Sequence, residues 1–107
     1  MFQTIDVAEL RRLRESGQAP QVVDVRTAAE VSRGTIGGAK HIELSTLPAR
    51  VPELDSGARV VVVCQSGARS AQACAYLAQR GFARACNLDG GIVAWVRAGL
   101  PLNGPER

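Results

Sequence analysis

Residues 59–70 of the chain read RVVVVCQSGARS, and this stretch decides the fold class. Its four consecutive valines show no polar alternation, which is typical of a strand buried on both faces of a parallel sheet. The apolar run ends at Cys64, and side chains at helical spacing follow from about residue 68 to residue 80. A buried strand that leads through a short loop into a helix predicts an α/β domain.

Strand and helix signals alternate along the rest of the chain. Short apolar runs predict strands, and the periodic segments between them predict helices. At the start of the first helix, Asp6 and Glu9 are spaced as a capping box, and Gly17 follows the last turn. We expect strands at residues 2–5, 21–25, 40–42, 59–64 and 84–88, and helices at residues 7–16, 27–33, 45–50, 68–80 and 91–98. Residues 1–107 are therefore expected to form one domain, with a central five-stranded, mainly parallel sheet and helices on both faces.

The composition argues against several classes of protein. With 46% hydrophobic residues, the chain is too apolar to be disordered. A net charge of only +3, with arginines spread along the chain and few aromatic residues, argues against a nucleic-acid partner. The longest apolar run, residues 60–64, is far too short to span a bilayer, so no membrane partner is expected. No basic segment followed by an apolar one stands at the N-terminus, and we expect a cytoplasmic location.

Three cysteines are present, at Cys64, Cys74 and Cys86. Their odd number and irregular spacing do not describe a disulfide framework. Together with a single histidine they are also poorly spaced for zinc, and no metal is expected. Cys74 lies on the apolar stripe of its expected helix and Cys86 lies in the last expected strand, so we interpret both as core residues.

Cys64 occupies the position where chemistry is expected, because ligands of open parallel sheets bind beyond the carboxyl ends of the strands. A thiol placed there faces unpaired backbone N–H groups and the positive end of a helix dipole. Both favour the thiolate, which is the nucleophilic form, and so lower the pKa of the thiol. Gly67 allows the loop to curl around the sulfur. Arg69 can pair with an anionic oxygen of a substrate, and the alternatives are a structural pair with a carboxylate or a solvated residue in the first turn of the helix.

Three segments, taken together, resemble the signatures of the rhodanese family. The central segment is Cys-x-x-Gly-x-Arg after a valine strand, at residues 64–69. The matching upstream residues are Asp24-Val25-Arg26, Glu30, Gly34, Ile36, Gly38-Ala39 and His41-Ile42. The matching downstream residues are Leu88-Asp89-Gly90-Gly91, Ala94-Trp95 and Gly99-Leu100-Pro101. The resemblance therefore covers residues 24–101, most of the chain, in the family's order.

The resemblance implies a rhodanese-like fold and sulfur transfer in two steps. Cys64 attacks the outer sulfur of thiosulfate or of a persulfide donor, and a persulfide remains on Cys64. A thiophilic acceptor such as cyanide, a thiol or a protein cysteine then takes that sulfur. No cofactor is implied, because the transferred sulfur stays on the enzyme. The loop residues expected to hold the small anionic donor are Gln65, Ser66, Gly67, Ala68, Arg69 and Ser70.

Two other functions share this sequence pattern. Rhodanese-like domains also serve as interaction or regulatory modules, although such modules commonly lack the cysteine that this chain has at position 64. Phosphatases and arsenate reductases use a related loop, and related phosphatases have one more residue between the cysteine and the arginine. Here residues 65–68 make four, and the shorter loop favours sulfur transfer over phosphate chemistry.

The chain departs from the family's pattern at three positions. Thr35 stands where many relatives have a histidine, and Glu43 stands where many have a proline. Gln65 replaces a basic residue that is often found beside the nucleophile, which removes one positive charge near the substrate.

Three further polar residues have a structural interpretation. Asp24 and Arg26 lie two positions apart at the end of an expected buried strand. We interpret them as an ion pair that ties the sheet to its loops. His41 is the only histidine. Because persulfide transfer needs no general base once the thiol is ionised, we expect His41 to make a structural hydrogen bond.

Overall fold

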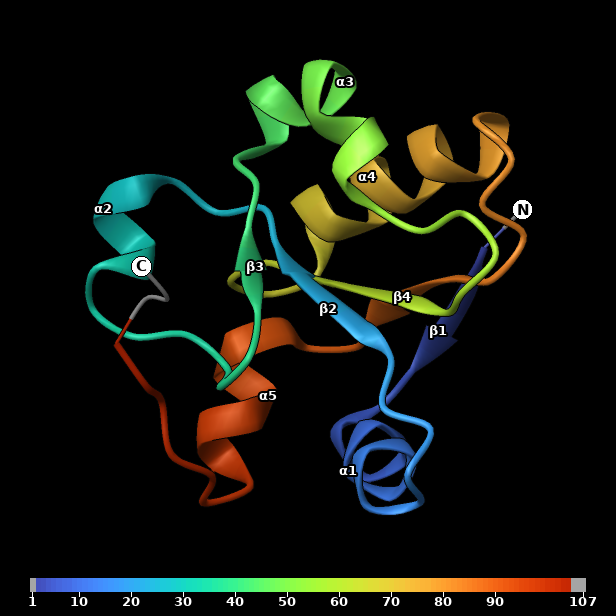
Figure 1. Cartoon of the computed structure of the whole chain (residues 1–107). Coiled ribbons are helices and arrows are strands. Elements are labelled where there is room, and N and C mark those ends of the chain that lie inside the picture. Colours follow the sequence, from blue (N-terminus) through green and yellow to red (C-terminus); the bar gives the residue numbers. More distant parts are fainter. Residues whose placement is uncertain (1, 105–107) are drawn as a thin grey trace.

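The computed structural model describes residues 2–104 of the chain and shows alternating strands and helices (Figure 1). The elements are β1 (Gln3–Ile5), α1 (Val7–Glu15), β2 (Gln21–Asp24), α2 (Ala28–Val31), β3 (Lys40–His41), the 3₁₀ turn η1 (Leu44–Thr46), α3 (Leu47–Arg50), the 3₁₀ turn η2 (Val51–Glu53), β4 (Val60–Val63), α4 (Ala68–Gln79), β5 (Ala85–Leu88) and α5 (Gly91–Arg97).

The strands form one sheet in the order β1-β5-β4-β2-β3. The prediction of a five-stranded sheet is confirmed. We predicted a mainly parallel sheet, and every neighbouring pair of strands in it is parallel. The valine strand β4 lies at the centre, paired with β2 on one side and β5 on the other. The carboxyl ends of all five strands therefore meet at one edge, where the loop after β4 begins.

The four valines of β4 divide the core into two layers. Val60 and Val62 belong to one buried cluster, and Val61 and Val63 belong to a second on the opposite face. Helices α3 and α4 cover the first cluster, and α1 and α5 cover the second (Figure 1). All four valines are at most 1% exposed, and burying each contributes about 1.5–3 kcal/mol. The uninterrupted apolar run thus serves a strand that is covered on both faces.

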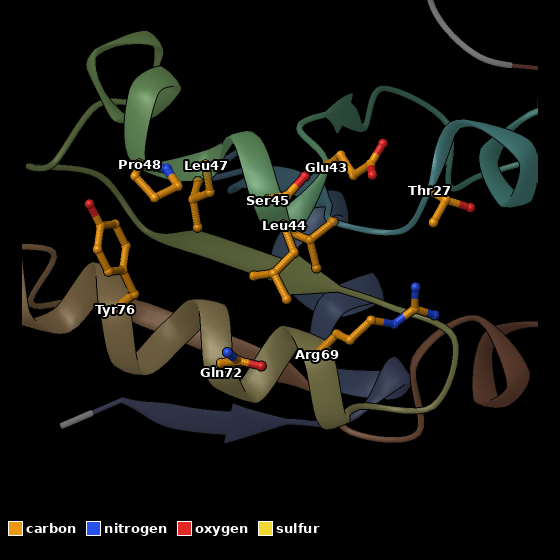
Figure 2. Close-up of a pocket in the computed structure, with 10 residues that line it drawn as sticks. Thr27, Glu43, Leu44, Ser45, Leu47, Pro48, Arg69, Gln72 and Tyr76 are labelled. Atoms are coloured by element: carbon orange, nitrogen blue, oxygen red, sulfur yellow. The ribbon is translucent and has the colours of Figure 1, made fainter.

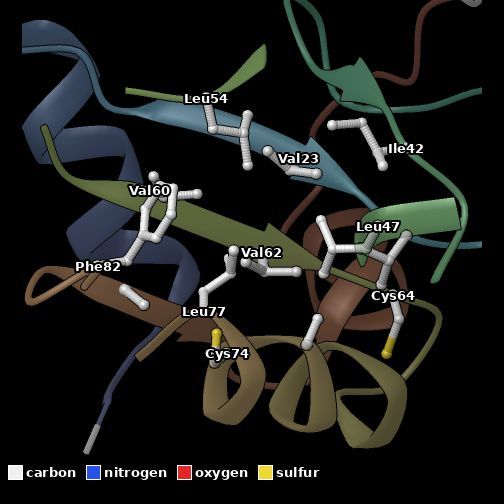
Figure 3. Packing of buried hydrophobic residues seen from close by; sticks show 13 residues of the cluster. Val23, Ile42, Leu47, Leu54, Val60, Val62, Cys64, Cys74, Leu77 and Phe82 are labelled. Carbon is white, nitrogen blue, oxygen red and sulfur yellow. The ribbon is translucent and has the colours of Figure 1, made fainter. Parts of the chain in front are cut away.

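The first of these clusters reaches the loop after β4 (Figure 3). Cys64 lies at the end of this layer, and Leu47 of α3 and Ile42 from the end of β3 belong to the same cluster. Cys74 belongs to it through α4, and Cys86 belongs to the second cluster through β5. Both are fully buried, so the interpretation of these two cysteines as core residues is confirmed.

The helix ends show where local hydrogen bonding departs from the predictions. Asp6 caps α1 by accepting from the N–H of Glu9 at 2.9 Å, but the Glu9 carboxylate accepts from Arg12 instead of completing a capping box. The complete capping box is made by Thr27 and Glu30 at α2. The helix expected over residues 27–33 is only Ala28–Val31, because the chain turns at the glycine that follows it, at position 34, with φ +123°.

The segment expected as a helix at residues 45–50 is divided into η1 and α3. Pro48 occupies the first turn of α3, where its missing N–H is tolerated.

Within residues 2–104 no helix combines the length and the apolar character needed to cross a membrane.

Candidate active site

The loop after β4 owes its shape to Gly67. This residue has φ +117° and directly precedes α4 as its N-cap. A Cβ added there would meet no atom closer than 3.8 Å, so the requirement for glycine comes from the backbone conformation and not from crowding. Gly67 therefore allows the chain to leave the strand and start the helix around one buried atom, the sulfur of Cys64.

Hydrogen-bond donors surround that sulfur. The Gly67 N–H donates to Cys64 Sγ at 3.0 Å, and the Ser70 hydroxyl lies 3.3 Å from the same atom. Burial of Cys64 would raise the pKa of its thiol, but donors from the Ser70 hydroxyl and from the N–H groups of Ser70, Gly67 and Ser66 outweigh it, and the pKa is lowered. The prediction that the loop stabilises a thiolate agrees with this geometry.

Asn87 supports the loop from the neighbouring strand. Its amide Nδ2–H donates to the carbonyl oxygen of Gly67 at 3.1 Å, and its Oδ1 lies 2.5 Å from the Ser70 hydroxyl. Ser70 is fully buried and Asn87 is 8% exposed, so both polar groups depend on these partners. Asn87 was not among the site residues predicted from the sequence. A polar residue in the otherwise apolar strand β5 is the signal that could have revealed it.

The start of α5 holds the backbone of the loop. The N–H of Ile92 donates to the carbonyl of Cys64 at 3.0 Å, and the N–H of Val93 donates to the carbonyl of Gln65 at 3.1 Å. A Cβ on Gly91 would lie 2.3 Å from the Cys64 carbonyl oxygen. Gly91 is therefore required for the close approach of two backbones that fixes the cysteine.

The structure separates the predicted loop residues by burial. Cys64 and Ser70 are buried, Gly67 and Arg69 are half-buried, and Gln65, Ser66 and Ala68 are exposed around them. The Gln65 side chain accepts through its Oε1 from Arg26 Nη1 at 3.2 Å.

Arg69 projects from the first turn of α4 toward α2. Its guanidinium donates to both carboxylate oxygens of Glu30, at 2.7 and 2.8 Å. Hydrogen bonding from Arg69 is the largest effect that lowers the pKa of Glu30, to about 2. The structure thus shows Arg69 in a bidentate ion pair, and its binding of a substrate oxygen stays a prediction.

The Asp24–Arg26 pair is buried beneath the site. The side chains are 1% and 4% exposed, and Arg26 Nη2 donates to Asp24 Oδ2 at 2.8 Å and to the Gly34 carbonyl at 2.8 Å. Thr35 donates to the same Asp24 oxygen at 2.7 Å. His41 Nε2 lies 2.7 Å from the Arg26 carbonyl oxygen. These contacts agree with the structural interpretation of all three predicted residues.

A groove of about 510 Å³ lies between α4 and the segment from the end of β3 to α3 (Figure 2). Arg69 stands at one end of its α4 side and Tyr76 at the other. Val25 and Leu47, which line the groove, belong to the same buried cluster as Cys64. The groove therefore adjoins the packing around the sulfur.

Comparison with known proteins assigns the chain to a family. The family described as "Rhodanese-like domain" matches residues 6–98. This chain belongs to the rhodanese family. It is 43% identical over 106 residues to a sulfurtransferase of Allochromatium vinosum, a match that covers 99% of both chains.

Two further relatives agree with this assignment. The thiosulfate sulfurtransferase GlpE of Pseudomonas aeruginosa is 39% identical over 94 residues, which cover 88% of this chain and 84% of that protein. The crystal structure of a rhodanese-like domain protein from Staphylococcus aureus superimposes with a TM-score of 0.88 at 32% identity, covering 97% of this chain and 99% of that one. The resemblance inferred from the three sequence segments is thereby confirmed.

The environments of the cysteines predict selective alkylation. Cys64 lies under an exposed loop, and hydrogen bonding to its sulfur lowers the pKa of its thiol, whereas burial raises the pKa of Cys74 to about 12. With a limiting amount of iodoacetamide near neutral pH, we expect Cys64 to be labelled at least about ten times faster than Cys74 or Cys86. Peptide mass mapping measures the three rates. Equal labelling of the native protein at all three positions would contradict an activated thiolate.

Proposed function

We propose that this rhodanese-family protein transfers sulfane sulfur through a persulfide on Cys64. The donor is thiosulfate or a persulfide, and the acceptor is a thiol, a protein cysteine or, in an assay, cyanide. The observation that supports the proposal is the N–H of Gly67, which donates to Cys64 Sγ at 3.0 Å in the loop that leads into α4.

The chemistry of each step follows from that arrangement. The Cys64 thiolate attacks the outer sulfur of thiosulfate, the bond between the two sulfurs of the donor breaks, and sulfite leaves with the bonding pair. The new persulfide carries the negative charge, which the loop N–H groups stabilise as they stabilised the thiolate. An acceptor thiolate then attacks the outer sulfur, and Cys64 leaves as a thiolate. No external oxidant or reductant is needed.

The reaction requires a reduced thiol at rest. Cys64, Cys74 and Cys86 are all free in the structure. A reducing compartment such as the cytoplasm suits such a site, and the cytoplasm is the location that we propose.

Intact mass spectrometry tests this proposal. We expect the purified protein to gain one sulfur atom when it is incubated with thiosulfate, and to lose it to cyanide with formation of thiocyanate. Peptide mapping is expected to place the added sulfur on the peptide that contains Cys64. The absence of any gain from folded protein with a reduced Cys64, with thiosulfate and with an organic persulfide alike, would favour the alternative of a binding module.

A phosphatase assay tests the remaining alternative, that the loop serves a phosphatase or an arsenate reductase. Under the proposal, hydrolysis of an aryl phosphate is negligible beside sulfur transfer, because the loop between Cys64 and Arg69 is short and Arg69 is paired with Glu30. Cys64-dependent hydrolysis as fast as the sulfur transfer would argue against this assignment.

A further inference from the structure

The groove beside the loop is larger than an inorganic sulfur donor needs. Its volume of about 510 Å³ falls in the range of sites that hold organic ligands. Leu44, Leu47, Pro48 and Tyr76 provide an apolar lining (Figure 2). An anion as small and as strongly hydrated as thiosulfate gains little from such a surface. The groove therefore suits a molecule with a carbon skeleton.

The charges at the groove do not favour an anion. Its lining includes two charged residues, Arg69 and Glu43. The positive charge of Arg69 is already matched by Glu30, whose carboxylate takes both of the short hydrogen bonds. Within residues 2–104 the carboxylate of Glu43 has no hydrogen-bond or ion-pair partner. The three side chains together therefore carry one net negative charge.

Nearby arginines do not reverse this balance inside the groove. Arg26 is paired with Asp24 and turned toward Gln65, which stands where a basic residue is often found beside the nucleophile. Arg33 lines a separate cavity of about 300 Å³ with Arg26 and Gln65. Neither guanidinium lines the groove itself.

We propose that this groove binds the organic part of the thiol that accepts sulfur from Cys64, and that Glu30 and Glu43 make it prefer a neutral or cationic thiol over an anionic one. The inference rests on the proposed function. In the step, the acceptor thiolate R–S⁻ attacks the outer sulfur of the Cys64 persulfide, the bond between the two persulfide sulfurs breaks, and Cys64 leaves as a thiolate. The proton that the acceptor thiol loses when it ionises passes to the persulfide anion and ends on the product R–S–SH, so no redox partner is needed.

Glu30 acts in this scheme as a specificity residue that neutralises Arg69. Replacing it with glutamine removes one negative charge and releases Arg69 for an anion, while the glutamine Oε1 can still complete the capping box with Thr27. Glu43→Gln removes the second negative charge. Glu53→Gln is the matched control, because Glu53 also pairs with an arginine, Arg50, but does not line the groove.

Three thiols of similar size and different charge serve as probes: cysteamine, 2-mercaptoethanol and 3-mercaptopropionate. The protein is first loaded with sulfur from a high concentration of thiosulfate and desalted, and the loss of the persulfide is then followed by intact mass with each thiol. The intrinsic reactivity of each thiol cancels when the variant is compared with the unaltered protein.

In Glu30→Gln and in Glu43→Gln we expect the ratio of the rate with 3-mercaptopropionate to the rate with cysteamine to rise about fivefold, the size expected for one charge at a partly exposed site. The rate with 2-mercaptoethanol, whose organic part is uncharged, should change less than the rate with 3-mercaptopropionate, and all rates of Glu53→Gln should stay unchanged. Ratios that stay within about twofold in both variants, or that change equally in Glu53→Gln, would overturn the inference. Failure of the unaltered protein to load with sulfur from any donor would instead overturn the proposed function, and the inference with it.

Discussion

Replacing Cys64 with serine is expected to lower kcat/KM for sulfur transfer from thiosulfate to cyanide by about three orders of magnitude or more. The serine hydroxyl occupies nearly the same space under the loop, so the N–H of Gly67 still has an acceptor. An alcohol, however, stays protonated at neutral pH and cannot hold sulfane sulfur as a persulfide. Thiocyanate formation measured with equal amounts of folded protein checks the loss.

Cys74→Ala is the matched control for this experiment. Cys74 is also a buried cysteine, on the helix that follows the loop, but its thiol packs in the core and burial raises its pKa to about 12. Its removal should leave the transfer rate within about twofold, since under the proposed function the sulfur is carried by Cys64. Thiocyanate formation by Cys64→Ser at a rate near that of the unaltered protein, with Cys74→Ala inactive, would place the nucleophile elsewhere.

The central strand and the loop were predictable because their signals are local. Four valines without alternation allow few environments other than a doubly covered strand, and a cysteine at the carboxyl end of such a strand has a defined position. The glycine in the loop, Gly67, was equally clear, because its left-handed conformation is rare for other residues. Fold class and loop therefore follow from one short stretch of sequence, and the role of Cys64 as nucleophile stays a prediction.

The partners of the loop were less predictable because they come from distant segments. Asn87 reaches Gly67 and Ser70 from β5, and Glu30 reaches Arg69 from α2, 39 positions away. The sequence shows that Arg69 is charged but not which carboxylate lies beside it. The sequence therefore left open whether Arg69 binds the substrate or pairs with a carboxylate, and the structure shows the pair with Glu30.

The predicted and observed structures also disagree at short helices and at helix ends. Helix α2 is only four residues long, so a capping box at one end and a glycine beyond the other determine nearly all of it. Periodicity over so few residues carries little information, and the expected helix was too long. At α1, Glu9 had two available partners, and the exposed arginine three residues on competes with the backbone for its carboxylate.

Replacing Asp24 with asparagine is expected to reduce the free energy of unfolding by about 3–5 kcal/mol. Asparagine keeps the shape and can still accept from Thr35, but it leaves the guanidinium of Arg26, 4% exposed, without a counter-charge. Such a loss is a large part of the total stability of a small domain, about 5–15 kcal/mol. Urea unfolding followed by the fluorescence of the buried Trp95 measures it.

Two further variants decide whether the buried charge is the cause. Glu9→Gln disrupts an ion pair of the same chemical type on the exposed face of α1, and its urea midpoint should stay nearly unchanged because water already screens that pair. The double variant Asp24→Asn/Arg26→Met removes both buried charges, and it should recover part of the stability lost in Asp24→Asn, although the Gly34 carbonyl loses its donor. If Asp24→Asn instead unfolds at an unchanged midpoint yet loses sulfur transfer, Asp24 belongs to the chemistry of the loop. Since the hydrogen bonds of its carboxylate go to Arg26 and Thr35, stability is the property that it is expected to control.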